Sequence, residues 1–133
     1  MVRLDLEAED LVVLRFHQPY APGDEPAYLL ALDGLARIER PFVLLALLGG
    51  GPALSQEGEK GQALWFKGAR IRLEAYCRAC ALVRPGASEG NAAMFRRLWS
   101  FPFLASPDEA AARAFLDRHR PSRTRAASGE SAR

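Results

Sequence analysis

The stretch that decides the fold is SEGNAAMFRRLWSFPFLASPDEAAARAFLDRHR, residues 88–120. Its pattern predicts a short helix over residues 92–99, a very short strand over 101–105 and a last helix over 107–119. Ser106 has the side chain and the position of an N-cap for that last helix. Almost no loop separates these elements, so the stretch continues an alternation of strands and helices that begins earlier in the chain.

Four strands are expected before this stretch. Residues 2–7 alternate apolar and charged side chains, which predicts a half-buried edge strand. Residues 11–16 follow after a short polar break, so these two strands should form an antiparallel hairpin. Residues 42–48 and 79–83 are apolar throughout, which is typical of inner strands that helices cover on both faces.

Two helices are expected between these strands. Apolar side chains recur at helical spacing over residues 28–38, with Asp24 or Glu25 at the N-terminus and Pro41 as the stop. A longer helix is expected over residues 55–77. The complete order, β-β-α-β-α-β-α-β-α, predicts an α/β fold with a mostly parallel five-stranded sheet, an antiparallel N-terminal edge strand and flanking helices.

Length and charge indicate one domain followed by a basic tail. The chain has 133 residues and a net charge of +2, and we expect a single domain over residues 1–120. Residues 121–133 contain no large apolar side chain, which predicts disorder. Residues 118–133 carry five arginines and one glutamate. Arginine can neutralise phosphate, but a solvated terminus is the favoured interpretation, so no nucleic-acid partner is expected.

The sequence predicts a cytoplasmic protein. Its start lacks the basic residues and the apolar run of a secretory signal. The longest apolar run, residues 42–48, is too short to span a bilayer. Two cysteines without an export signal are typical of a reducing compartment.

The ending FRRLWSFPFLASPDEAAARAFL, together with the element order and the length, resembles the SpoIIAA-like family of STAS-like domains. These domains are related to sporulation anti-sigma-factor antagonists. In that family a short aromatic-Pro-apolar strand follows a helix, and an acidic helix start and an alanine-rich helix come next. Residues 101–103 (Phe-Pro-Phe), 108–109 (Asp-Glu) and 110–116 match this pattern. The resemblance covers residues 1–120.

The resemblance implies a non-enzymatic domain that docks on partner proteins, and some relatives bind small ligands or contact membrane surfaces. True antagonists carry a phosphorylatable serine in an Asp-Ser-Ser-Gly-like motif between the central strand and the next helix. Here that region reads GGGPALSQEGEKG, and Ser55 occupies a similar place without the flanking Asp and Ser-Gly. Ser55 is therefore a candidate phosphorylation site. A plain N-cap is the favoured alternative, because Glu57 and Glu59 would repel a phosphate.

Two loops at the carboxyl ends of strands are expected to share a ligand pocket, as is common in open α/β sheets. The candidate pocket residues are His17, Tyr20, Gly50, Gly51, Ser55 and Trp65. The glycine-rich loop that begins at Gly49 lacks the Gly-Lys-Ser/Thr ending that grips nucleotide phosphates. A tight exit from the sheet is the favoured interpretation, and no cofactor is expected.

The cysteines and histidines do not suggest catalysis or metal binding. Cys77 and Cys80 form a C-x-x-C motif, but Cys77 lies at a helix end, where the dipole opposes a thiolate, and Cys80 lies in an apolar strand. Both are expected to be buried, unreactive thiols. His17 and His119 are the only histidines and lie far from any ligand cluster in the sequence. We expect no catalytic residue and no metal site.

An aromatic and basic segment forms the candidate partner or membrane face. Its residues are Met94, Phe95, Arg96, Arg97 and Trp99. Packing of this helix on the sheet is favoured over an exposed docking face. The sequence as a whole predicts a regulatory or protein-interaction domain, with a homodimer as one form of docking. The alternative is a small apolar-ligand or lipid-binding protein that makes peripheral contact with the membrane surface.

Overall fold

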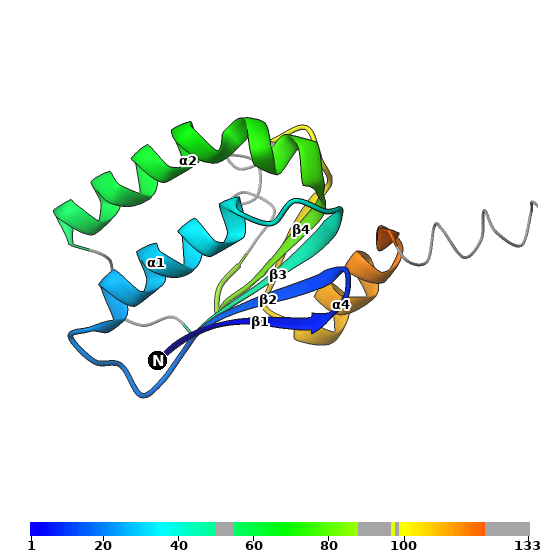
Figure 1. Cartoon of the computed structure of the whole chain (residues 1–133). Helices are drawn as coiled ribbons and strands as arrows, with labels where there is room; N and C mark the ends of the chain where they lie inside the picture. Colours follow the sequence, from blue (N-terminus) through cyan, green and yellow to red (C-terminus); the bar gives the residue numbers. More distant parts are fainter. Residues whose placement is uncertain (50–54, 88–96, 98, 122–133) are drawn as a thin grey trace, which may run out of the picture.

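The computed structural model of the chain describes residues 1–49, 55–87, 97 and 99–121. Within these residues, five strands lie side by side in chain order (Figure 1). They are β1 (Val2–Ala8), β2 (Leu11–Phe16), β3 (Phe42–Leu48), β4 (Cys77–Val83) and β5 (Phe103–Ser106). β1 pairs with β2 in antiparallel orientation, and the other pairs are parallel. The predicted α/β class and the predicted mixed sheet are confirmed.

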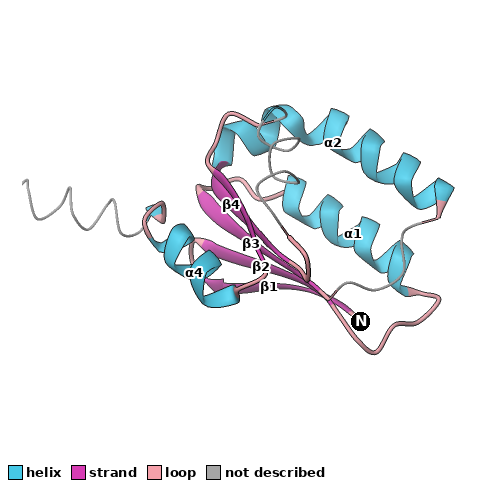
Figure 2. Ribbon diagram, turned by 180° about the vertical axis from the view of Figure 1, so that it is seen from behind, coloured by secondary structure: helices cyan, strands magenta, loops and turns pink. Residues whose placement is uncertain are grey.

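Helices lie on both faces of the sheet. α1 (Asp24–Ala36) and α2 (Gln56–Tyr76) cover one face, and α4 (Glu109–Asp117) lies against the other. Figure 2 shows the same three layers from behind. The crossovers through α1 and α2 connect neighbouring parallel strands in one direction across the sheet, which keeps both helices on the same face.

Side chains of the inner strands alternate between the two faces of the sheet, and each face is buried in a hydrophobic core of its own. Val12, Leu14 and Phe42 pack toward α1 and α2. The core beneath α4 contains Leu11, Val13, Val43, Leu45, Ala79, Ala81, Ala112 and Leu116. The strands that are apolar throughout are therefore buried on both faces, as predicted.

The start of α2 follows the prediction, whereas the start of α1 does not. Ser55 is the N-cap of α2, and its Oγ accepts a hydrogen bond from the Gly58 amide at 3.1 Å. The N-cap of α1 is Gly23, so the prediction of Asp24 or Glu25 as the capping residue is wrong. The Asp24 carboxylate accepts from the chain's terminal ammonium, and the Glu25 carboxylate accepts from Ser55. Both acids bind neighbouring segments instead of the amides of their own helix.

The last strand and helix are shifted from their predicted positions. β5 begins at Phe103 because Pro102 has no N–H with which to extend the ladder. The N-cap of α4 is Asp108, whose Oδ1 accepts from the Ala110 amide at 3.1 Å. The prediction of Ser106 as the cap is wrong, since its Oγ accepts from the Asp108 amide at 3.0 Å.

Part of the decisive stretch lies outside the described residues. Of the helix predicted over residues 92–99, only Arg97 is described as helical. Residues 122–133 of the predicted tail are also outside the described part of the chain.

Candidate ligand-binding site

An apolar cavity of about 220 Å³ lies between the sheet and the helices α1 and α2. Its floor comes from β3 and β4, including Leu44, Ala46 and Leu82. Leu48, the last residue of β3, and Arg84, directly after β4, also line it. The cavity therefore reaches the carboxyl ends of the inner strands, which is where open α/β sheets hold ligands.

Aromatic rings form the opposite wall. The Trp65 and Phe66 ring centroids of α2 are 5.1 Å apart, and the Phe66 ring lies 5.7 Å from that of Trp99. Trp99 stacks on Phe101 at 5.2 Å. All four residues line the cavity. The chain contains two tryptophans, so both report on the state of this cavity.

Glu74 of α2 fixes the segment that carries two of these rings. Its carboxylate accepts a hydrogen bond from the Ser100 amide at 3.0 Å and another from the Ser100 hydroxyl. Ser100 lies between Trp99 and Phe101. This contact therefore ties the connection before β5 to α2 and sets the position of the two rings.

Polar groups on the cavity wall are few. The Tyr28 hydroxyl donates to Gln62 Oε1 at 2.6 Å, which satisfies both groups inside an apolar surface. Burial raises the pKa of Tyr28 to about 12, so the phenol stays neutral. The Trp65 Nε1–H is buried and has no acceptor among the described residues. The described lining residues of α1 and α2 are therefore all uncharged.

The two cysteines lie on the cavity face of β4. Phe42 pairs with Cys77, but Val43 pairs with Ala79, so Arg78 is an additional residue in β4 at this point. The extra residue brings Cys77 and Cys80 onto the same face of the sheet, where both line the cavity. Burial raises the pKa of Cys77 to about 12 and that of Cys80 well above the usual value. Both thiols are free, protonated and buried.

Arg84 is the one charged side chain among the described residues that line the cavity. Its backbone is fixed beside β5, because its amide donates to the Ser106 carbonyl at 3.3 Å and its carbonyl accepts from the Ala87 amide at 3.2 Å. Within the described part of the chain, no carboxylate pairs with its guanidinium. Arg84 was not among the predicted pocket residues. The period-two spacing Cys80, Leu82, Arg84 was the signal that places it on the cavity face.

No family model, curated protein or solved structure matches the chain. Among the described residues, no three His, Cys, Asp or Glu side chains gather where a metal ion would bind. The helices that the structure describes are all too short or too polar to cross a membrane.

The structure does not bring the described members of the predicted pocket together at one place. Trp65 lines the cavity, whereas His17, Tyr20 and Ser55 are not among its lining residues. Gly50 and Gly51 lie outside the described residues.

The loop that carries His17 and Tyr20 lies against Gly49, which directly follows β3. A Cβ atom at Gly49 would lie 2.6 Å from the Tyr20 hydroxyl oxygen and 3.3 Å from the His17 Cα. The Gly49 amide also donates to the Phe16 carbonyl at 2.8 Å. This close approach between the ends of β2 and β3 requires a glycine. His17 Nδ1 is 2.6 Å from the Gln18 carbonyl, so the histidine is engaged within its own loop.

Ser55 has a partner that the sequence did not reveal. Its Oγ donates to Glu25 Oε2 at 2.8 Å, and its amide donates to Glu25 Oε1 at 2.7 Å. A phosphate on Ser55 would therefore face the Glu25 carboxylate as well as Glu57 and Glu59 in the first turn of α2. These contacts favour the N-cap interpretation of Ser55.

The predicted partner or membrane face is only partly described. Met94, Phe95 and Arg96 lie outside the described residues. Arg97 is exposed, and Trp99 is 8% exposed and lines the cavity. Trp99 thus belongs to the interior of the domain.

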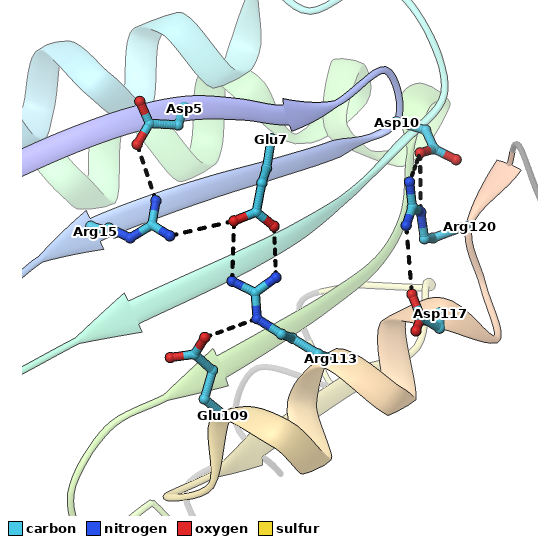
Figure 3. A network of polar contacts seen from close by, with 8 residues as sticks. All are labelled: Asp5, Glu7, Asp10, Arg15, Glu109, Arg113, Asp117 and Arg120. Carbon is cyan, nitrogen blue, oxygen red and sulfur yellow. Dashed lines mark hydrogen bonds and ion pairs between the residues drawn. The ribbon is translucent and has the colours of Figure 1, made fainter.

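A charged network joins α4 to the N-terminal hairpin (Figure 3). Arg113 Nη1 lies 2.6 Å from Glu7 Oε2, and Arg113 Nε lies 2.8 Å from Glu109 Oε2. The hydrogen bond from Arg113 holds the pKa of Glu7 below its usual value. Near the start of β2, Arg120 binds the buried Asp10 carboxylate at 2.7 Å. These contacts join α4 and the residue Arg120 after it to the N-terminal hairpin, on the face of the sheet opposite α1 and α2.

Proposed function

We propose that the chain is a non-enzymatic binding domain whose apolar cavity holds a small apolar ligand. The observation that carries this proposal is the 220 Å³ cavity between the sheet, α1 and α2. A cavity of about 150 Å³ with a similar apolar lining holds benzene, which has six non-hydrogen atoms. By volume, this cavity would hold a ligand of about nine non-hydrogen atoms.

The architecture supports a regulatory setting for this binding. The resemblance of the sequence to STAS-like domains supports this part of the proposal, together with a mixed sheet in chain order that has an antiparallel N-terminal strand and helices on both faces. Domains of that kind act by docking instead of by chemistry, and ligand occupancy would then alter a docking surface. We propose that this takes place in the cytoplasm.

Intrinsic tryptophan fluorescence tests the proposal directly. Titration with 1-octanol, an uncharged molecule of nine non-hydrogen atoms, should give a saturable change because Trp65 and Trp99 line the cavity. The Ala46→Phe variant fills the floor and should abolish binding. Ala63→Phe, on the exposed face of α2, is the matched control and should bind like the unchanged protein. An unsaturable response, or unchanged binding by Ala46→Phe, would contradict the proposal.

A second candidate is a protein-interaction domain that pairs with a second copy of itself. Leu64 and Ile71 are 71% and 83% exposed on α2 and lie seven residues, or two turns, apart. Leu30 of α1 is 72% exposed. Leu64 and Ile71 lie on one side of α2, and neighbouring exposed apolar side chains are a feature of interaction surfaces. Sedimentation should detect a dimer that the Leu64→Lys variant dissociates, and a monomer at all concentrations would exclude this candidate.

A further inference from the structure

We infer that the ligand is an apolar monocarboxylate, with its hydrocarbon part in the cavity and its carboxylate on Arg84. The inference rests on the proposed function and specifies the ligand's head group. It follows from the position of Arg84, which is the only charged side chain among the described residues that line the cavity.

Arg84 has the geometry for this role. Side chains of β4 alternate between the two faces of the sheet, and Cys80 and Leu82 line the cavity one after the other. Arg84 continues this row just beyond the end of the strand, where the cavity reaches the carboxyl edge of the sheet. A ligand that lies along the floor would therefore bring one end to the guanidinium.

The electrostatics favour a carboxylate at that end. Among the described lining residues there is no acid, so none competes for Arg84. Other arginines are already held by carboxylates, as Arg72 is by Glu39 at 2.9 Å and Arg113 is by Glu7 at 2.6 Å. A guanidinium presents paired N–H donors that match the two oxygens of a carboxylate. The half-buried position of Arg84 limits the screening of such a pair by water.

The size and the lining restrict the rest of the ligand. The cavity volume corresponds to about nine non-hydrogen atoms, and the Tyr28–Gln62 bond leaves that polar pair satisfied without a ligand. The other described lining surface is aliphatic, aromatic or thiol, apart from the Trp65 Nε1–H, which can donate one hydrogen bond. A second charged group on the ligand would be buried without a counter-ion among these residues, which is costly. The ligand class is therefore a hydrocarbon chain or a single ring with one acid group.

The experiment compares octanoate with octanamide, which have the same shape and ten non-hydrogen atoms each but differ in charge. Both are titrated against the full chain by tryptophan fluorescence and by calorimetry. Octanoate should bind about tenfold more tightly, as expected for a partly exposed charge-assisted pair. The preference should disappear in Arg84→Gln. It should persist in Arg70→Gln, which changes the net charge equally at an exposed position of α2.

The outcomes separate the inference from the proposed function. If both molecules bind with equal affinity to the unchanged protein, the cavity function stands and the carboxylate assignment is overturned. A preference for octanoate that survives in Arg84→Gln also overturns it. If neither molecule binds, both the proposed function and the inference fail. The comparison within the unchanged protein needs no variant, so a misfolded Arg84→Gln protein would not remove the test.

Discussion

The Glu7–Arg113 pair yields a stability prediction with a defined pH dependence (Figure 3). Two Arg113 nitrogens face the two Glu7 oxygens, at 2.6 and 3.3 Å, and thus connect α4 to β1. The perturbation is a double-mutant cycle of Glu7→Gln, Arg113→Gln and the combined variant. The coupling free energy isolates this pair from other effects of each substitution, including the loss of the Arg113–Glu109 contact.

The expected coupling is modest because the side chains are 32% and 37% exposed. Exposed ion pairs are worth about 0.2–1 kcal/mol, and the two-point geometry places this one near about 1 kcal/mol. The folded-state pKa of Glu7 lies below its ordinary value of 4.5. The contribution to stability is therefore complete above pH 4.5 and is lost as the pH falls through the lowered pKa.

The assay is urea unfolding of the four proteins in low salt at about pH 7 and at about pH 3. The coupling should be present at the higher pH, decline at the lower pH and weaken in high salt. The Glu39–Arg72 pair is the control, because Glu39 is 71% exposed and its coupling should be smaller. Zero coupling in low salt near neutrality, or equal coupling at both pH values, would refute the reasoning.

Three further predictions concern the thiols, the α2 cap and the outer face of α2. Cys77 and Cys80 should not react with a disulfide reagent at about pH 8 in the folded protein and should react after unfolding, since burial raises both pKa values. Rapid labelling of the folded protein would contradict this and show that β4 is accessible. Ser55→Ala should lower the free energy of unfolding, measured in urea, by about 1 kcal/mol. Ser55→Asp should lower it further, because the new carboxylate would face that of Glu25, and equal losses in the two variants would exclude this repulsion. Gly68→Ala should raise the unfolding free energy by about 0.5–1 kcal/mol, because its Cβ would meet nothing within 4 Å; a lower melting temperature would contradict this.

Strand positions followed from the sequence wherever burial dominates. The expected bounds of residues 11–16 and 42–48 agree with those of β2 and β3, because a run of apolar side chains can be buried on both faces only inside a sheet. The antiparallel hairpin of β1 and β2 also followed from a local pattern. These features depend on residues that are close to one another in the chain, so the sequence pattern alone predicts them.

Contacts between distant residues could not be predicted in the same way. Asp24 and Glu25 are suitable caps by composition, yet both bind groups outside their own helix. Nothing in the sequence of β4 indicates that Arg78 is an extra residue in the strand. This extra residue places Cys77 and Cys80 on the same face of the sheet. The predicted pocket was assigned to loops at the carboxyl edge of the sheet, whereas the cavity extends from that edge along the floor beneath α1 and α2. Of the described members of the predicted set, only Trp65 lines it.

The two faces of β4 explain why the apolar cavity lies on the side of α1 and α2. Toward α4 the strand presents Ala79 and Ala81, which are fully buried against Ala112. Small side chains let a helix approach a sheet closely, so this face packs without space for a ligand. Toward α1 and α2, rigid rings such as Trp65 and Phe66 stand above small floor residues such as Ala46. Rigid rings cannot change shape to fill the space above small residues such as Ala46. An unfilled apolar volume costs free energy in proportion to its size. Occupancy by the proposed ligand would recover that free energy.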